Sequence, residues 1–105
     1  MLNHPSVIAR ACAITELGQR LENKFNAKLF DLIVQSVKDK QNQTQYVKGL
    51  ISVAHIGMSV LCKLNYPEIK IVINQLLQFW DETDRNDLLW FLKSEGIEVN
   101  QFQSI

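Results

Sequence analysis

Three side chains that could take part in nucleophilic catalysis have spacings that suit one face of a helix. Ser52, His55 and Ser59 are three and four residues apart, and side chains at these separations share a helix face. A Ser–His pair attacks an acyl group when a carboxylate orients the imidazole and backbone amides form an oxyanion hole. The surrounding helical segment has no carboxylate, and amides inside a regular helix are already bonded. The pattern therefore favours a half-exposed polar stripe, and a small helical enzyme with His55 in a pocket is only an alternative.

Metal and nucleotide motifs are absent from the sequence. No pair among the two histidines (His4, His55) and the two cysteines (Cys12, Cys62) has the i, i+3 or i, i+4 spacing of a helical metal site. The four glycines are far apart and form no phosphate-binding loop. We therefore expect no catalytic residue, no metal and no cofactor.

Length and composition indicate one globular domain, residues 1–105, of average apolar and charged content. Eleven basic and eleven acidic residues leave no net charge to attract nucleic acid or an anionic membrane. Two cysteines are too few for a disulfide framework, and the first residues do not have the pattern of a signal peptide. These features predict a cytoplasmic protein with reduced thiols and no membrane partner.

Apolar residues recur at intervals of three and four along most of the chain, whereas strand-like alternation is weak. This pattern predicts an all-α fold, a compact bundle of about five helices with short connections. Capping residues and helix breakers set the expected boundaries. The expected helices cover about 6–24, 27–40, 45–64, 67–80 and 84–95, followed by an irregular tail from about residue 98.

The third expected helix, about 45–64, is apolar around most of its circumference and is therefore expected at the centre of the bundle. Leu50, Met58 and Leu61 fall on its main apolar face, so we expect them in the core. Its narrow polar stripe is expected to be half exposed. The stripe consists of Lys48, Ser52, His55, Ser59 and Lys63.

Surplus apolar surface predicts contact with another chain, because a small monomer has few places to bury it. The candidate interface residues lie on three expected helices: Val53, Ile56, Val60, Ile71 and Trp90. We therefore expect a non-enzymatic interaction module, a regulator or adaptor, which forms a homodimer and binds an unidentified protein. The alternative is that the irregular tail of the same chain covers one part of this apolar surface with Val99, Phe102 and Ile105.

A nucleic-acid-binding regulator is the second hypothesis. Residues 1–70 carry nine basic and five acidic side chains, whereas residues 71–105 carry two basic and six acidic ones. Contacts with phosphates would therefore come from Arg10, Arg20, Lys24, Lys28, Lys38 and Lys40. These basic residues alternate with acidic ones, which is typical of a solvated surface, so nucleic acid is the less favoured partner.

Overall fold

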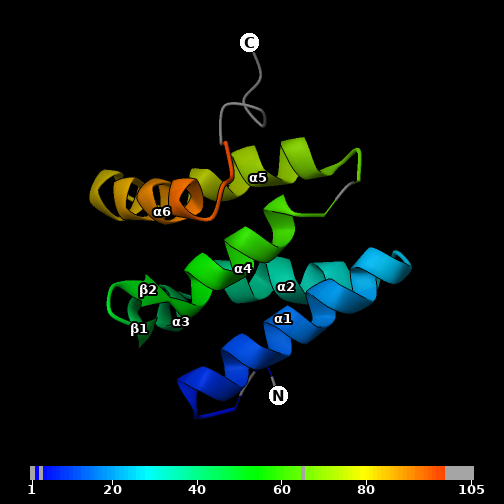
Figure 1. Ribbon diagram of the computed structural model, residues 1–105, viewed down its shortest axis with the longest axis horizontal. Helices are drawn as coiled ribbons and strands as arrows, with labels where there is room; N and C mark the ends of the chain where they lie inside the picture. Colours follow the sequence, from blue (N-terminus) through cyan, green and yellow to red (C-terminus); the bar gives the residue numbers. More distant parts are fainter. Residues whose placement is uncertain (1, 3, 65, 99–105) are drawn as a thin grey trace.

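The computed structural model describes residues 2, 4–64 and 66–98. Over these residues the chain forms six helices and one two-stranded antiparallel sheet (Figure 1). The elements are α1 (Val7–Asn23), α2 (Ala27–Lys38), α3 (Lys40–Thr44), β1 (Tyr46–Lys48), β2 (Ile51–Ser52), α4 (Val53–Cys62), α5 (Ile69–Leu77) and α6 (Glu82–Ser94). The expected helical bundle is confirmed, with the small sheet as an addition. None of the helices in the described ranges has the length and apolar character needed to cross a bilayer.

Several helix ends lie where local sequence signals predict them. Ser6 and Asn26 each accept hydrogen bonds from backbone N–H groups in the first turns of α1 and α2. Such caps satisfy amides that have no partner within the helix. Gly96, at φ +79°, follows α6, and the Ile97 N–H donates to the Leu92 carbonyl at 3.0 Å. This Schellman-type ending folds Ile97 back toward the last turn of α6.

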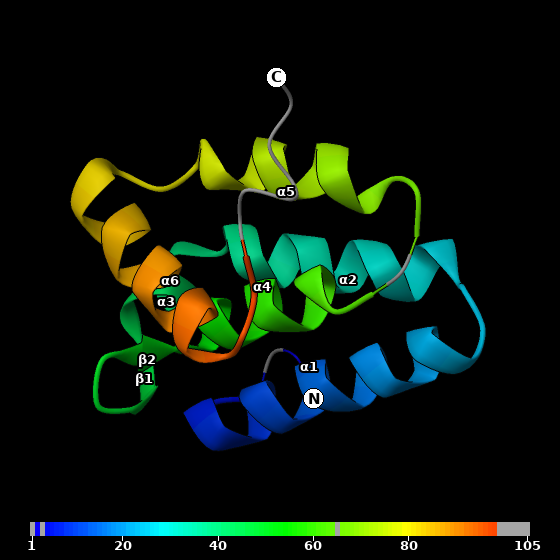
Figure 2. The same cartoon turned by 45° about the horizontal axis from the view of Figure 1, so that its top comes forward.

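Helix α4 is the central element of the bundle. It contacts all five other helices, and Figure 1 shows α5 and α6 on the opposite side of it from α1, as Figure 2 also does for α5. Met58 and Leu61 are completely buried, as predicted. The apolar circumference of α4 is therefore covered largely within one chain.

Two glycines allow close packing between α4 and the first two helices. A Cβ added to Gly18 of α1 would lie 2.3 Å from Cγ1 of Val60, and one added to Gly57 of α4 would lie 2.6 Å from Cγ2 of Val37. Real Cβ atoms do not approach other atoms this closely. The contacts explain why these helices contain glycine in spite of its cost of up to about 1 kcal/mol relative to alanine.

The start of the central helix differs from the expected one. Residues 46–52 form the hairpin β1–β2, and α4 begins only at Val53, after its N-cap Ser52. Gly49 has φ +55°, a conformation that favours glycine and reverses the chain. The β-branched and aromatic residues of the hairpin suit extended backbone. The prediction of a helix from about residue 45 was therefore wrong.

The hairpin also changes the position of Leu50. Its register pairs Tyr46 with Ser52 and Lys48 with Ile51, so Leu50 lies in the connecting turn. Leu50 is 71% exposed, and the prediction that it belongs to the core was wrong. The reason is that a turn directs this side chain away from the bundle.

Other boundaries differ by a few residues. Helix α5 covers Ile69–Leu77 instead of about 67–80, and α6 begins at Glu82, after its N-cap Asp81, instead of at about residue 84. Asp81 accepts a hydrogen bond from the Asp84 N–H at 2.9 Å. The expected tail lies outside the described residues from residue 99 onward.

Candidate functional site

His55 belongs to the core and not to an exposed stripe. Its side chain is only 4% exposed, and Ser52 and Ser59 are buried as well. The His55 Nδ1 accepts a hydrogen bond from the Ser52 N–H, and the Ser52 Oγ accepts one from the His55 N–H, both at 3.2 Å. This reciprocal pair is a capping box at the start of α4. Lys48 and Lys63 of the predicted stripe are exposed, but the prediction was wrong for its three middle residues, where α6 packs over His55 through Phe91.

Two aromatic rings enclose the imidazole. The His55 ring centroid lies 5.5 Å from that of Trp80 and 5.7 Å from that of Phe91, each with an interplanar angle of 18°. Burial lowers the pKa of His55, and the negative charge of Asp87 opposes this effect in part. Because Nδ1 accepts a hydrogen bond, the neutral ring carries its proton on Nε2. The buried ring thus helps to hold α6 against the start of α4.

The cavity beside His55 has room for little more than a water molecule. It has a volume of about 10 Å³, and its lining includes Trp80, Asp84 and Asp87. The Trp80 Nε1 is buried and has no hydrogen-bond partner among the described residues. Within those residues no group of three or more His, Cys, Asp or Glu side chains could hold a metal ion. This geometry gives no support to the hypothesis of a catalytic pocket at His55.

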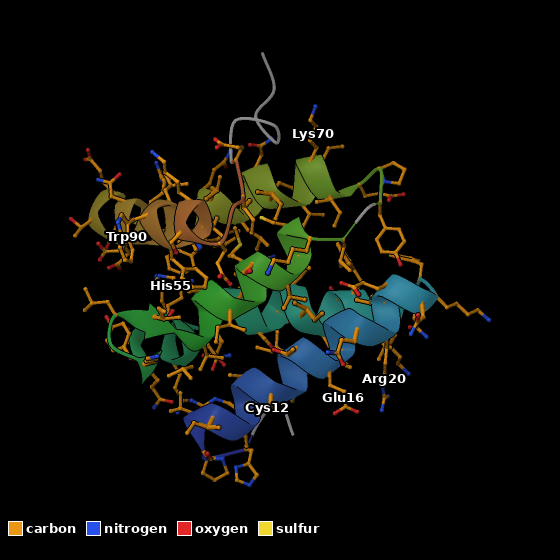
Figure 3. All side chains as sticks on the ribbon, in the orientation of Figure 1. Cys12, Glu16, Arg20, His55, Lys70 and Trp90 are labelled. Carbon is orange, nitrogen blue, oxygen red and sulfur yellow. The ribbon has the colours of Figure 1, made fainter. Side chains whose placement is uncertain are left out.

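A larger and mainly apolar groove lies between the β-hairpin and α6. We call it the hairpin groove, and it has a volume of about 340 Å³. Its lining consists of Lys48, Gly49, Leu50, Ile51, Asp87, Trp90 and Phe91. Leu50 at 71% and Trp90 at 68% are the two most exposed large apolar side chains in the described part of the chain. Figure 3 shows Trp90 on α6 and His55 at the same end of the molecule. The groove thus unites two unusually exposed apolar groups.

The groove has one charged residue on each wall. Lys48 belongs to the hairpin wall and Asp87 to the α6 wall, and both are exposed. Neither forms an ion pair within the described ranges. Phe91 lies between the groove and the buried site, because it lines the groove and stacks on His55.

A buried arginine anchors the chain just before the hairpin. Arg10 is 4% exposed, and its Nε donates to the Asn42 side chain at 3.0 Å. One terminal nitrogen donates to the carbonyls of His4 and Pro5, and the other donates to the Gln45 side chain. Gln45 directly precedes β1. Arg10, which the nucleic-acid hypothesis assigned to phosphate contact, therefore has a structural role.

The five predicted interface residues occupy different environments. Val53 is completely buried, and Ile56 and Val60 are half-buried on α4. Ile71 is exposed on α5 but does not line the hairpin groove, whereas Trp90 does. The structure therefore brings Trp90 together with Leu50, which sequence reasoning placed in the core. The signal that could have identified Leu50 was Gly49, because glycine is favoured at the first position of a two-residue hairpin turn and Gly49–Leu50 lies between the β-branched residues Val47 and Ile51.

Two other grooves are lined in part by charged side chains that have partners within the chain. A groove of about 490 Å³ between α1 and α2 includes Glu16 and Arg20, which form an ion pair at 2.9 Å. A groove of about 410 Å³ between α2 and α5 includes Phe79, whose ring centroid lies 4.9 Å from the Lys38 ammonium. The hairpin groove is the better candidate because, within the described ranges, neither Leu50 nor Trp90 has a charged side chain over it in an ion-pair or cation–π contact.

Comparisons of the chain with protein-family models, with curated proteins and with solved structures find no match. A functional interpretation therefore depends on the geometry and chemistry of the hairpin groove.

Proposed function

We propose that this chain is a non-enzymatic protein-interaction module, a regulator or adaptor, which binds a polypeptide in the hairpin groove. The observation that carries this proposal is the location of Leu50 and Trp90, the two most exposed large apolar side chains described, in one groove. Aromatic anchors in apolar pockets dominate the binding energy of protein interfaces. Exposed apolar groups gathered in this way mark interaction sites on small proteins.

The walls of the groove suit binding without large rearrangement. Phe91 is fixed by its contact with His55, and the hairpin is tied to α4 by the hydrogen bond from the Val53 N–H to the Gln45 carbonyl at 3.1 Å. A preformed site loses less conformational entropy when it binds. Self-association into a homodimer is part of this proposal. So is a cytoplasmic location, supported by the unpaired thiols of Cys12 and Cys62.

Site-specific photo-crosslinking in cells that express the protein tests this function. A photoreactive benzoylphenylalanine replaces Leu50 in the groove or, as a matched control, Ile8 of α1, which is 62% exposed and does not line the groove. We expect position 50 to crosslink to a polypeptide, and we expect Trp90→Ala to reduce the yield by about tenfold, as for a hot-spot residue. Equal crosslinking from both positions, or none from position 50, would contradict the proposal.

The two other hypotheses gain no support from the geometry. For nucleic acid, Arg10 is buried, Arg20 pairs with Glu16 and Lys38 lies over the Phe79 ring, so three of the six expected phosphate contacts are already engaged. For an enzyme, the cavity beside His55 is smaller than any organic substrate. Binding to DNA that weakens steeply with salt would instead favour the first of these hypotheses.

A further inference from the structure

We infer that the hairpin groove is filled by the hairpin of a second copy of this chain, in a dimer with two-fold symmetry. Leu50 of each copy inserts beside Trp90 and Phe91 of the other. This inference rests on the proposed function, because it assigns the occupant of the same groove.

The first argument is shape. Leu50 projects from the turn of the hairpin, and the groove lies directly beside it, since Leu50 itself forms one edge. A two-fold interface requires a surface that is complementary to itself. Leu50 next to the hairpin groove meets this requirement. A two-fold rotation places Leu50 of each copy over the groove of the other copy.

The second argument is charge. Lys48 lies on the hairpin wall and Asp87 on the α6 wall. When the hairpin of one copy packs on α6 of the other, each Lys48 approaches the opposite Asp87, so the dimer gains two ion pairs. The α6 wall and its N-terminal turn carry further carboxylates, since Asp81 and Asp87 both lie close enough to Asp84 to add to the rise in its pKa that burial causes. Residues 48–50 of the hairpin suit this acidic α6 wall, because they combine a lysine with an apolar side chain.

The third argument is the amount of apolar surface that one contact covers. Tyr46 of β1 is, after Leu50, a second exposed large apolar side chain on this hairpin, and both residues line the small cavity next to the groove. A two-fold contact covers Tyr46, Leu50 and Trp90 of both copies at once. A stable dimer buries about 800 Å² per partner around an apolar centre, and these aromatic and aliphatic groups supply that centre.

The experiment is sedimentation equilibrium with charge-reversed variants. Wild-type protein at micromolar concentration should return twice the monomer mass of 12.1 kDa. Lys48→Glu or Asp87→Lys alone places like charges opposite each other and should weaken the dimer by about tenfold or more. The double variant restores opposite charges and should recover most of the affinity. Lys28→Glu is the matched control and should have no effect, because Lys28 is exposed on α2 and does not line the hairpin groove.

A second measurement tests the geometry directly. In a mixed sample of isotope-labelled and unlabelled chains, filtered NMR spectra should show intermolecular contacts between the Leu50 methyl groups and the Trp90 indole. Thermal unfolding of each variant at low concentration shows whether the monomer is still folded, which is expected because both charged residues are exposed.

The outcomes separate this inference from the proposed function. A monomer at all concentrations whose residue 50 still crosslinks to a different protein overturns the dimer and retains the interaction module. A dimer that neither single charge reversal weakens, and that shows no contact between Leu50 and Trp90, overturns the two-fold arrangement. A monomer with no crosslink from residue 50 overturns both.

Discussion

Ser52 and His55 each accept a hydrogen bond from the backbone N–H of the other, and this exchange joins the last residue of the hairpin to the first turn of α4. The contact needs an imidazole without a proton on Nδ1. The stability of the fold therefore depends on the protonation state of a single buried ring.

Acid should destabilise the protein through His55. Burial lowers the pKa of this histidine in the folded state, whereas the unfolded chain takes up a proton near the ordinary value of about 6.5. The unfolded state thus binds more protons, and stability is complete above this pH and falls as the pH drops below it. The limit is about 1.4 kcal/mol per pH unit for one proton. Denaturant unfolding between about pH 7.5 and about pH 5 measures the slope, and His55→Gln should remove most of it. An identical slope in both proteins would refute the role of His55.

Truncation of two leucines should have very different effects. Leu61 is completely buried, so Leu61→Ala should lower the free energy of unfolding by about 2–5 kcal/mol, and Met58→Ala should behave alike. Leu50→Ala removes an exposed side chain and should change the stability of the monomer by less than about 0.5 kcal/mol. Denaturant titration at a concentration below dimer formation measures both values. Comparable losses at positions 50 and 61 would show that the hairpin is misplaced.

The two thiols should differ strongly in reactivity. Cys12 is exposed on α1, whereas Cys62 is buried, and this burial raises the pKa of its thiol to about 12. Since the thiolate is the reactive form, a thiol reagent at neutral pH should label Cys12 rapidly and Cys62 only after unfolding. Mass spectrometry of native and denatured samples, with Cys12→Ser as control, measures the two rates. Faster native labelling of Cys62 would contradict the packing of α4.

Loss of Arg10 should loosen the base of the hairpin. Arg10→Met leaves the Asn42 and Gln45 side chains without this donor and should cost about 1–3 kcal/mol in the free energy of unfolding. Hydrogen exchange at the Val53 amide, which bonds to the Gln45 carbonyl, should accelerate. The matched control is Arg20→Met, which removes only an exposed ion pair with Glu16 and should have little effect. Unchanged exchange at Val53 would show that Arg10 does not support the hairpin.

Features of the fold that depend only on residues close together in the sequence could be predicted. The caps at Ser6 and Asn26 and the glycine ending at Gly96 are local interactions, so residue type at one position is enough to indicate them. The apolar spacing of α4 was recognised too, but its extension backward through residues 46–52 was wrong. The apolar residues of a short hairpin can fit a helical period as well as a strand.

The environment of His55 could not be predicted in this way. Its burial depends on Trp80 and Phe91, which are distant in the sequence and approach only when α6 packs on α4. No local pattern carries that information. The exposure of Leu50 likewise depends on the turn at Gly49, whose conformation the helical interpretation concealed.

The central position of α4 has a consequence for biosynthesis. Helices α1 and α2 leave the ribosome before α4, yet both pack on α4, and Ile14 and Ile33 share one core cluster with residues of that later helix. Their apolar stripes are therefore without their main cover for part of translation, a state that favours aggregation or chaperone binding. Synthesis of α4 ends this interval, so α4 determines when α1 and α2 can bury their apolar stripes.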